Sequence, residues 1–182
     1  MKILMHACCG PCSIVPAEEL LNEGASLFAH FENPNIHPFT EWEKRRETFM
    51  GHMDRMGVRV LPDKGYGLKS WMREVSFREA QRCAICYRMR LSATAALARS
   101  GGFDAFTTTL LYSKFQNHEK IRETGEAAAA EYGVPFLYRD FRTGWKRGVE
   151  ESKRLGMYRQ QYCGCALSEE ERYAPKKGER LP

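Results

Sequence analysis

The chain has 182 residues, of which 43% are hydrophobic and 28% are charged, and its formal net charge is +5. The length suits one domain, since domains commonly run to about 100–200 residues. No stretch approaches the roughly 18 apolar residues of a membrane span, and the apolar run at 1–6 is too short for a signal peptide, so we expect a cytoplasmic protein without membrane contact. The moderate positive charge fits an anionic partner such as RNA without requiring one.

Short apolar runs alternate with helical patterns along the whole chain. A capping box of Thr40 and Glu43 predicts the start of the second helix, and Gly133 suits the end of the fifth. We expect a single domain over 1–182. Its tail from Glu169 is charged and is predicted to be loose. The predicted strands are 2–6, 26–31, 58–61, 103–109 and 135–138, and the predicted helices are 13–23, 40–56, 68–75, 84–99, 119–132 and 145–155.

This alternation predicts an α/β fold. Buried apolar strands separated by helices favour a Rossmann-like parallel sheet of about five short strands, with helices on both faces. Ligands of such sheets bind beyond the carboxyl ends of the strands. The first cysteine motif directly follows the first predicted strand. We therefore expect a metal or cysteine site at the carboxyl edge of the sheet.

All seven cysteines stand in three tight groups, each about seventy residues from the next. Thiols that only fill a core would be scattered. Structural disulfides are rare in the cytoplasm, and an odd number leaves one thiol without a partner, so the pattern favours metal or redox chemistry. The groups are Cys8, Cys9 and Cys12; Cys83 and Cys86; and Cys163 and Cys165.

Four of these thiols form a candidate metal-ligand set. Cys83 and Cys86 lie about one turn apart at a helix start, a spacing that suits zinc or an iron–sulfur cluster. The adjacent pair Cys8 and Cys9 is unusual for zinc, but on a Gly-Pro turn it could reach two irons of a compact cluster. Four thiolates are what an iron–sulfur cube needs. A structural zinc site stays open as the alternative, and His6 could be a ligand, a group behind the ligands or a packed core histidine.

The Cys163-Gly-Cys165 pair has a different character. Cysteines at i and i+2 form a disulfide only in a small, strained ring, and strained disulfides are easily reduced. Such a pair suits a two-electron shuttle better than a structural link. Alternatively, one or both thiols complete a metal site. Cys12 could join either arrangement.

Together these motifs resemble the epoxyqueuosine reductases of the QueH type over nearly the whole chain. The resemblance implies reduction of epoxyqueuosine at the wobble position of tRNA to queuosine, the last step of queuosine biosynthesis. It also implies a [4Fe–4S] cluster on Cys8, Cys9, Cys83 and Cys86, and a redox-active disulfide between Cys163 and Cys165. A second metal ion, iron or another, stays open, as does the identity of a low-potential electron donor. The five landmarks are His6-Ala-Cys-Cys-Gly-Pro-Cys12, Phe31-Glu-Asn-Pro-Asn-Ile-His-Pro38, Arg82-Cys-Ala-Ile-Cys-Tyr-Arg88, Thr107-Thr-Thr-Leu-Leu-Tyr-Ser-Lys-Phe-Gln-Asn-His118 and Tyr162-Cys-Gly-Cys165.

Reduction of an epoxide to an alkene and water consumes two electrons and two protons, so a proton donor is needed. A substrate-facing loop at 112–118 is predicted, with a capped loop before a helix as the alternative. A wobble base must leave its stack to reach a buried site, and proteins read such bases by stacking and hydrogen bonds. The candidate proton donors are His6, His118, Tyr112 and Glu32; the candidate phosphate-binding residues are Arg82, Arg88 and Arg90; and the candidate stacking or core aromatics are Phe39, Trp42, Trp71 and Trp145.

Two other functions are alternatives to this one. A zinc-stabilised RNA-binding module without catalysis has no need of the extra Cys163-Gly-Cys165 pair. A thiol-based tRNA sulfur-transfer enzyme would carry a Gly/Ser-rich phosphate loop after the first strand. That position holds Cys8-Cys-Gly-Pro-Cys12, so use of ATP is not expected.

Overall fold

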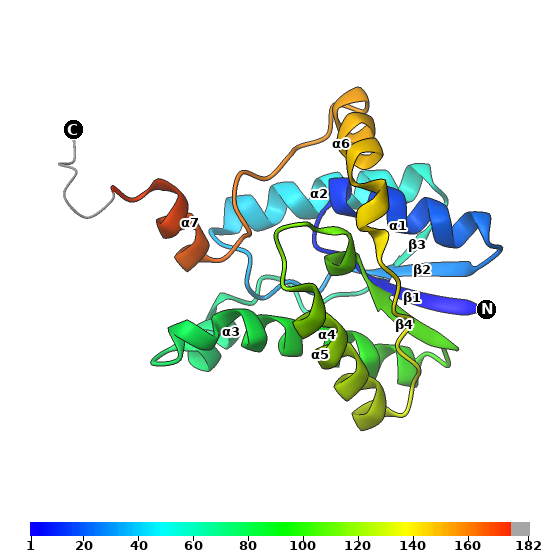
Figure 1. Cartoon of the computed structure of the whole chain (residues 1–182), viewed down its shortest axis with the longest axis horizontal. Helices are drawn as coiled ribbons and strands as arrows, with labels where there is room; N and C mark the ends of the chain where they lie inside the picture. The colour runs from blue at the N-terminus through cyan, green and yellow to red at the C-terminus, as the bar shows by residue number, and fades with distance from the viewer. Residues whose placement is uncertain (176–182) are drawn as a thin grey trace.

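Four parallel strands form the centre of the molecule in the order β3-β2-β1-β4 (Figure 1). A computed structural model describes residues 1–175 of the chain. In the sheet His6 pairs with His30 on one side and with Thr108 on the other, so these residues lie at one edge. The strands are β1 (Lys2–His6), β2 (Ser26–His30), β3 (Arg59–Leu61) and β4 (Ala105–Thr108).

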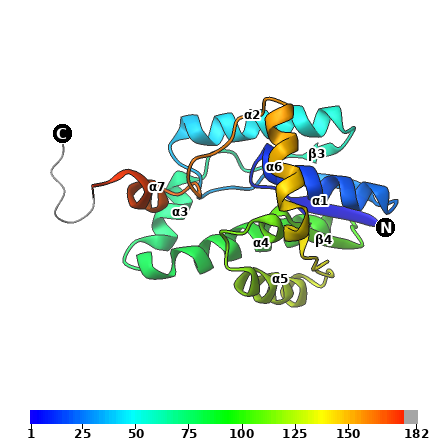
Figure 2. The same cartoon turned by 45° about the horizontal axis from the view of Figure 1, so that its top comes forward.

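Helices cover both faces of this sheet, as Figure 2 shows. On one face lie α1 (Gly10–Asn22), α2 (Phe39–Arg55) and α6 (Trp145–Arg154), and on the other lie α4 (Arg82–Ser100) and α5 (His118–Tyr132). Two shorter helices, α3 (Leu68–Val75) and α7 (Ala166–Tyr173), flank the carboxyl edge. No helix within residues 1–175 is long and apolar enough to cross a membrane.

The central strands are buried on both faces, which explains their continuous apolar sequence. Leu4 and Met5 of β1 are fully buried, and all four residues of β4 are buried as well. A strand covered by helices on both sides cannot alternate polar and apolar residues. The predicted α/β class is therefore confirmed.

The sheet has four strands rather than about five. The predicted strand at 135–138 forms an isolated parallel bridge, in which Phe136 lies opposite Phe106. Pro135 has no amide hydrogen to donate, and Tyr138 donates its amide to the Phe136 carbonyl of its own segment. The segment therefore leaves the sheet after one bridge.

The starts of α1, α2, α4 and α5, which lie one to three residues earlier than predicted, and the tail also differ from the sequence prediction. The helix α2 begins at Phe39 after Pro38, without a side-chain cap, so the predicted capping box at Thr40 is wrong. The Pro38 carbonyl already accepts the first amide hydrogen bonds of α2. The predicted loose tail is helical as far as Tyr173 in α7, and its part at 176–182 lies outside the described residues.

The start of α1 matters most for the site. This helix begins at Gly10 instead of 13, with Cys9 as its N-cap and a proline in its first turn. Proline is favoured there because the first helical amides have no partner within the helix. The first cysteine motif therefore lies in the loop and first turn between β1 and α1.

Candidate metal centre and active site

The site is at the point where the strand order reverses. From β1 the chain builds β2 and β3 to one side, and β4 is added later on the other side. The loops after β1 and β4 must therefore diverge, which leaves a crevice at their carboxyl ends. Cys8 follows β1, Thr109 follows β4, and the Cys8 amide donates a hydrogen bond to Thr109 Oγ1 over 3.3 Å.

Three thiols converge in this crevice. The sulfur atoms of Cys8, Cys9 and Cys12 all lie within 4.8 Å of one another, a spacing that could hold a metal ion. Cys9 and Cys12 are buried and Cys8 is partly exposed. Gln160, from the segment after α6, donates to Cys9 Sγ at 3.2 Å and to Cys12 Sγ at 3.5 Å. The structure thus groups Cys12 with the first two cysteines.

The three thiols do not ionise alike. Hydrogen bonds from the Cys12 and Cys9 thiols lower the pKa of Cys8 well below its usual value. Burial raises the pKa of Cys9, and the hydrogen bond to Cys8 raises that of Cys12. Cys8 therefore loses its proton first, as the start of a metal site requires.

A buried arginine connects this triad with the second cysteine group. Arg90 of α4 is 2% exposed, and its guanidinium donates to His6 Nε2 at 3.3 Å, Cys86 Sγ at 3.5 Å and Asn33 Oδ1 at 2.7 Å. Burial opposes the charge on Arg90, but the nearby sulfur atoms of Cys86 and Cys8 raise its pKa nevertheless. None of these hydrogen-bond partners is a carboxylate. A buried cation needs an anion, and Cys8, whose pKa is lowered, is the neighbouring thiol that ionises first.

His6 is locked beneath the triad. Its Nδ1 is 2.9 Å from Thr108 Oγ1, and its Nε2 lies 3.1 Å from the Glu32 carbonyl oxygen and 3.3 Å from Arg90 Nε. The ring is thus contacted at both nitrogen atoms. Burial, followed by the charge of Arg90, holds the pKa of His6 well below 6.5.

The second and third cysteine groups share one neighbourhood. Burial raises the pKa of Cys83, and it raises that of Cys86 to about 12; the charges of Cys163 and Cys165 act in the same direction on both. Cys83 and Cys163 are exposed, whereas Cys86 and Cys165 are buried. All seven cysteines are free thiols in this structure.

Arg45 of α2 holds the Cys-Gly-Cys loop in place. This buried guanidinium donates to the Cys163 carbonyl at 2.9 Å and to the Tyr162 carbonyl at 3.0 Å, and it pairs with Glu41 at 2.6 Å. Gly164 has a φ of +136°, a conformation essentially reserved for glycine. A Cβ there would also lie 3.1 Å from the Arg45 guanidinium. The glycine between the two cysteines is thus required by the backbone.

Two residues that the sequence did not single out contact this neighbourhood, Gln116 in the loop before α5 and Tyr87 in α4. Gln116 donates from Nε2 to Cys163 Sγ at 3.3 Å, and its Oε1 accepts from the Tyr87 hydroxyl at 2.9 Å. Burial raises the pKa of Tyr87, and the charges of Cys83, Cys86 and Cys163 raise it further. Their only sequence signal is their position in the third and fourth landmarks, in which the predicted site residues are cysteines, arginines and other donors.

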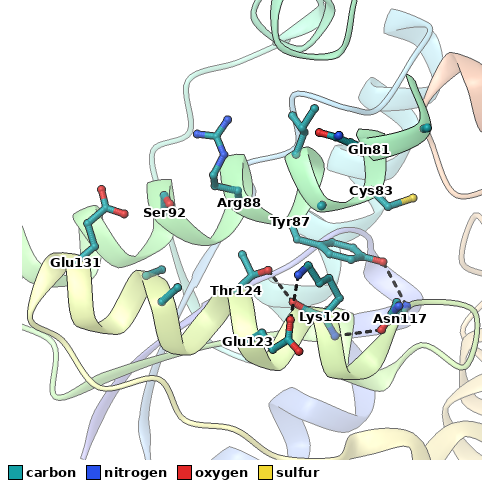
Figure 3. A pocket seen from close by; sticks show the side chains of 15 residues that line it. Gln81, Cys83, Tyr87, Arg88, Ser92, Asn117, Lys120, Glu123, Thr124 and Glu131 are labelled. Atoms are coloured by element: carbon teal, nitrogen blue, oxygen red, sulfur yellow. Dashed lines mark hydrogen bonds and ion pairs between the residues drawn. The ribbon is translucent and has the colours of Figure 1, made fainter. Parts of the chain in front are cut away.

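An open groove leads away from this neighbourhood between α4 and α5. Its volume is about 780 Å³. In Figure 3 the Cys83 side chain and the Tyr87 ring lie at the end near the start of α5, beside Asn117. Arg88 and Lys120 also line the groove, and each forms an ion pair, with Glu74 and Glu123 respectively. One end of the groove is therefore lined by a thiol of the site.

The candidate proton donors occupy different surroundings. Burial and then the charges of Cys12 and Cys9 raise the pKa of Tyr112, so this hydroxyl is close to the triad, where it donates to the Trp145 carbonyl at 3.1 Å. His118 instead contacts the Tyr138 hydroxyl at 3.0 Å, and Arg142 and Asp140 are the charges that act most on its pKa. Burial raises the pKa of Glu32, which accepts a hydrogen bond from the Lys64 amide.

Several of the residues predicted to contact RNA are buried in the structure. Arg90 is buried among the site residues and does not present its guanidinium to a phosphate. Trp42 and Trp71 are core residues, whereas Phe39 is 46% exposed and Trp145 is partly exposed. Arg82 pairs with Glu171 at 2.5 Å and Arg88 pairs with Glu74 at 2.8 Å, both near the surface.

The fold and this site define an α/β protein with a cluster of thiols at its sheet switch point that could hold a metal ion. The family description "Epoxyqueuosine reductase QueH" matches residues 3–171. Relatives of that name are 37% identical in Dehalococcoides mccartyi (94% of each chain covered) and 36% identical in Thermotoga maritima (91% of this chain and 89% of the relative). The chain therefore belongs to the epoxyqueuosine reductase QueH family, and it is an oxidoreductase by class.

A solved structure supports the fold independently. The predicted subunit of tRNA methyltransferase from Methanocaldococcus jannaschii superposes with a TM-score of 0.54 over 84% of this chain and 76% of the other. The two sequences are 10% identical. At that identity the likeness concerns the arrangement of strands and helices alone.

Proposed function

We propose that this enzyme reduces epoxyqueuosine at the wobble position of tRNA anticodons to queuosine. The supporting observation is the convergence of all three cysteine groups around Arg90 and the switch point, within a chain of the QueH family. We place the reaction in the cytoplasm, where thiols stay reduced. A low-potential electron donor of unknown identity completes the set of partners.

The residues present fit an iron–sulfur cluster. The triad supplies clustered thiols of which Cys8 ionises first, and Arg90 supplies a buried positive charge that needs anionic sulfur. We propose Cys8, Cys9, Cys83 and Cys86 as the ligands of a [4Fe–4S] cluster, with Cys12 as a further thiol for an additional metal ion. When bound, such a cluster transfers electrons one at a time.

The Cys163–Cys165 pair is our candidate for the two-electron store. Oxidation of two thiols to a disulfide releases two electrons and two protons. Cleavage of the epoxide to an alkene and water consumes the same number. The electron donor then reduces the disulfide again. The Arg45 anchor holds the carbonyl of Cys163 while Gln116 donates to its sulfur, so the exposed thiol is kept at a fixed place.

Among the candidate proton donors we favour Tyr112. Burial and then the charges of Cys12 and Cys9 raise its pKa, so it holds its proton at neutral pH beside the triad. Buried and neutral, His6 serves to position Arg90 and the strand ends. A donor must come within hydrogen-bond reach of the leaving oxygen.

The reaction itself tests this proposal. Protein purified without oxygen is analysed for iron and sulfide, and then incubated with tRNA that carries epoxyqueuosine and a low-potential reductant. We expect iron and sulfide in the purified protein and conversion to queuosine, detected by mass spectrometry of the digested nucleosides.

Three outcomes would contradict separate parts of the proposal. A colourless protein that contains only zinc would exclude the redox mechanism and favour a zinc-stabilised RNA-binding module. An iron-loaded protein that leaves epoxyqueuosine in tRNA unchanged would exclude the substrate. tRNA that gains sulfur instead would favour the sulfur-transfer alternative.

A further inference from the structure

Phe115 is an apolar side chain placed in water beside the reactive thiols. It lies in the loop between β4 and α5 and is 84% exposed. Single exposed apolar residues are common on protein surfaces, so exposure alone indicates nothing. What distinguishes Phe115 is how firmly its loop is held and what the next residue contacts.

The loop around Phe115 is fixed from both sides. The Phe115 amide donates to Ser113 Oγ at 3.2 Å, and the Asn117 amide donates to the Tyr87 hydroxyl at 3.3 Å while its side chain caps α5. The Phe115 ring packs edge-to-face against Trp145, with 5.5 Å between the ring centroids and 78° between the ring planes. The ring is thus held in position before any ligand arrives.

The same loop contacts the active site. Gln116, the next residue, donates to the sulfur of the exposed Cys163. A planar group resting on Phe115 would therefore lie one residue away from a contact to the thiol. Phe115 is thus adjacent in sequence to a residue that contacts the exposed thiol, and it is not one of the three triad residues.

A cation stands directly beside the ring. Lys114 is exposed and pairs with no carboxylate within residues 1–175. Proteins that bind unpaired nucleic acid combine aromatic rings, on which bases stack, with cations that follow the phosphates. The pair of Lys114 and Phe115 provides both in adjacent positions.

We propose that Phe115 is the platform on which an unpaired base next to the modified base of the anticodon loop stacks, with Lys114 at the adjoining phosphate. This inference rests on the proposed function and specifies its substrate as a single-stranded RNA loop. It assigns to the 113–117 loop the task of holding the RNA while the modified base enters the thiol site.

Binding of a synthetic anticodon stem–loop RNA, measured by fluorescence anisotropy with the iron-loaded protein, tests the platform. Phe115→Ala and Phe115→Leu should raise Kd by about 10-fold or more, since both remove the π face. Phe115→Tyr should stay within about 3-fold of the unchanged protein. Lys114→Gln should reduce the slope of log Kd against log salt by about one. Phe77→Ala is the matched control, because Phe77 is 98% exposed on another loop.

Stacking is overturned if Phe115→Leu binds the stem–loop as tightly as the unchanged protein, or if Phe77→Ala weakens binding as much as Phe115→Ala. A stem–loop that does not bind at all also overturns it. If the stem–loop binds in a Phe115-dependent way but epoxyqueuosine is not reduced, the proposed function fails while the platform stands. Circular dichroism of each variant confirms that the fold is kept.

Discussion

At the scale of single residues, the two buried arginines of the site differ in their hydrogen-bond partners. Arg90 is buried, yet its hydrogen bonds go to an imidazole, an amide oxygen and a thiol. Arg45, equally buried, pairs with Glu41. Cys8, whose pKa is lowered, is the anion that we propose as the partner charge of Arg90. Arg90 would then help to retain the proposed metal centre without ligating it.

Replacing Arg90 should therefore release metal. In Arg90→Met we expect the iron content of anaerobically purified protein to fall by at least about half. The free energy of unfolding should fall by about 3 kcal/mol, the scale seen when one partner of a buried charge pair is removed. Arg88→Met is the control, since Arg88 makes a surface ion pair worth about 0–1 kcal/mol. Equal iron loss in both variants would refute the role of Arg90.

The Cys-Gly-Cys pair makes a separate prediction. If Cys163 and Cys165 act as one redox unit, Cys163→Ser, Cys165→Ser and the double variant should all lose turnover to the same background level, because residues that act together are not additive. All three should keep their iron, measured by a colorimetric assay. Iron loss in Cys163→Ser would instead make Cys163 a metal ligand.

At the scale of elements, the approach of α1 to α2 sets the geometry of the triad. A Cβ on Gly10 would lie 2.8 Å from Thr48 Cγ2 and 3.1 Å from the Thr48 carbonyl oxygen. Gly10 is the first residue of α1, between Cys9 and Cys12. Any larger side chain must push the start of α1 away from α2, and the two cysteines move with it.

Gly10→Ala should accordingly destabilise the protein by about 1–3 kcal/mol, the usual penalty of overpacking, and lower its iron content. Gly51→Ala offers a matched comparison, because Gly51 lies in α2 with open space around its Cα. There alanine should stabilise by up to about 1 kcal/mol. Urea unfolding measures both, and a neutral Gly10→Ala would show that the helices can separate freely.

The elements themselves were largely predictable because their signals are local. The bounds of β1 and α3 agree with the predicted ranges, since an apolar run and a helical spacing fix them. The contacts of the buried arginines were not predictable. Arg90 meets His6 across 84 positions of sequence, and Arg45 meets Cys163 across 118. In sequence both arginines are typical of solvated helix faces, and only the packing of α2 and α4 turns them inward.

At the scale of the whole molecule, the sheet topology brings the three cysteine groups to one edge. The helices that follow β3 and β4 both begin there, so α4 presents Cys83 and Cys86 beside the loop that follows β1. This part followed from the sequence, because parallel strands align their carboxyl ends. The gathering of Cys12 with Cys8 and Cys9 did not, because it depends on α1 starting at Gly10.

The same packing buries all the histidines of the chain. Each of the five has a lowered pKa, with burial as the largest cause: His6, His30, His37, His52 and His118. Glu32 has the opposite effect on the pH dependence of stability, because its pKa is raised. Since five histidines act in one direction and Glu32 in the other, the folded protein should bind fewer protons than the unfolded chain in mild acid. Its free energy of unfolding should therefore fall there.

His30 allows this to be tested for one group. Burial lowers its pKa from 6.5 to about 4, and its Nδ1 is 3.1 Å from Thr94 Oγ1. Between these two pH values the unfolded chain binds a proton that the folded protein does not, so the stability due to this group is full above pH 6.5 and declines as the pH falls toward 4. From pH 7 to pH 5 the loss is about 2 kcal/mol.

The variant His30→Gln keeps a donor for Thr94 but does not titrate. Its free energy of unfolding should therefore fall by about 2 kcal/mol less than that of the unchanged protein between pH 7 and pH 5. Urea unfolding measures this difference, and the iron content of both proteins is checked. An identical decline in both proteins would show that His30 is not held neutral by burial.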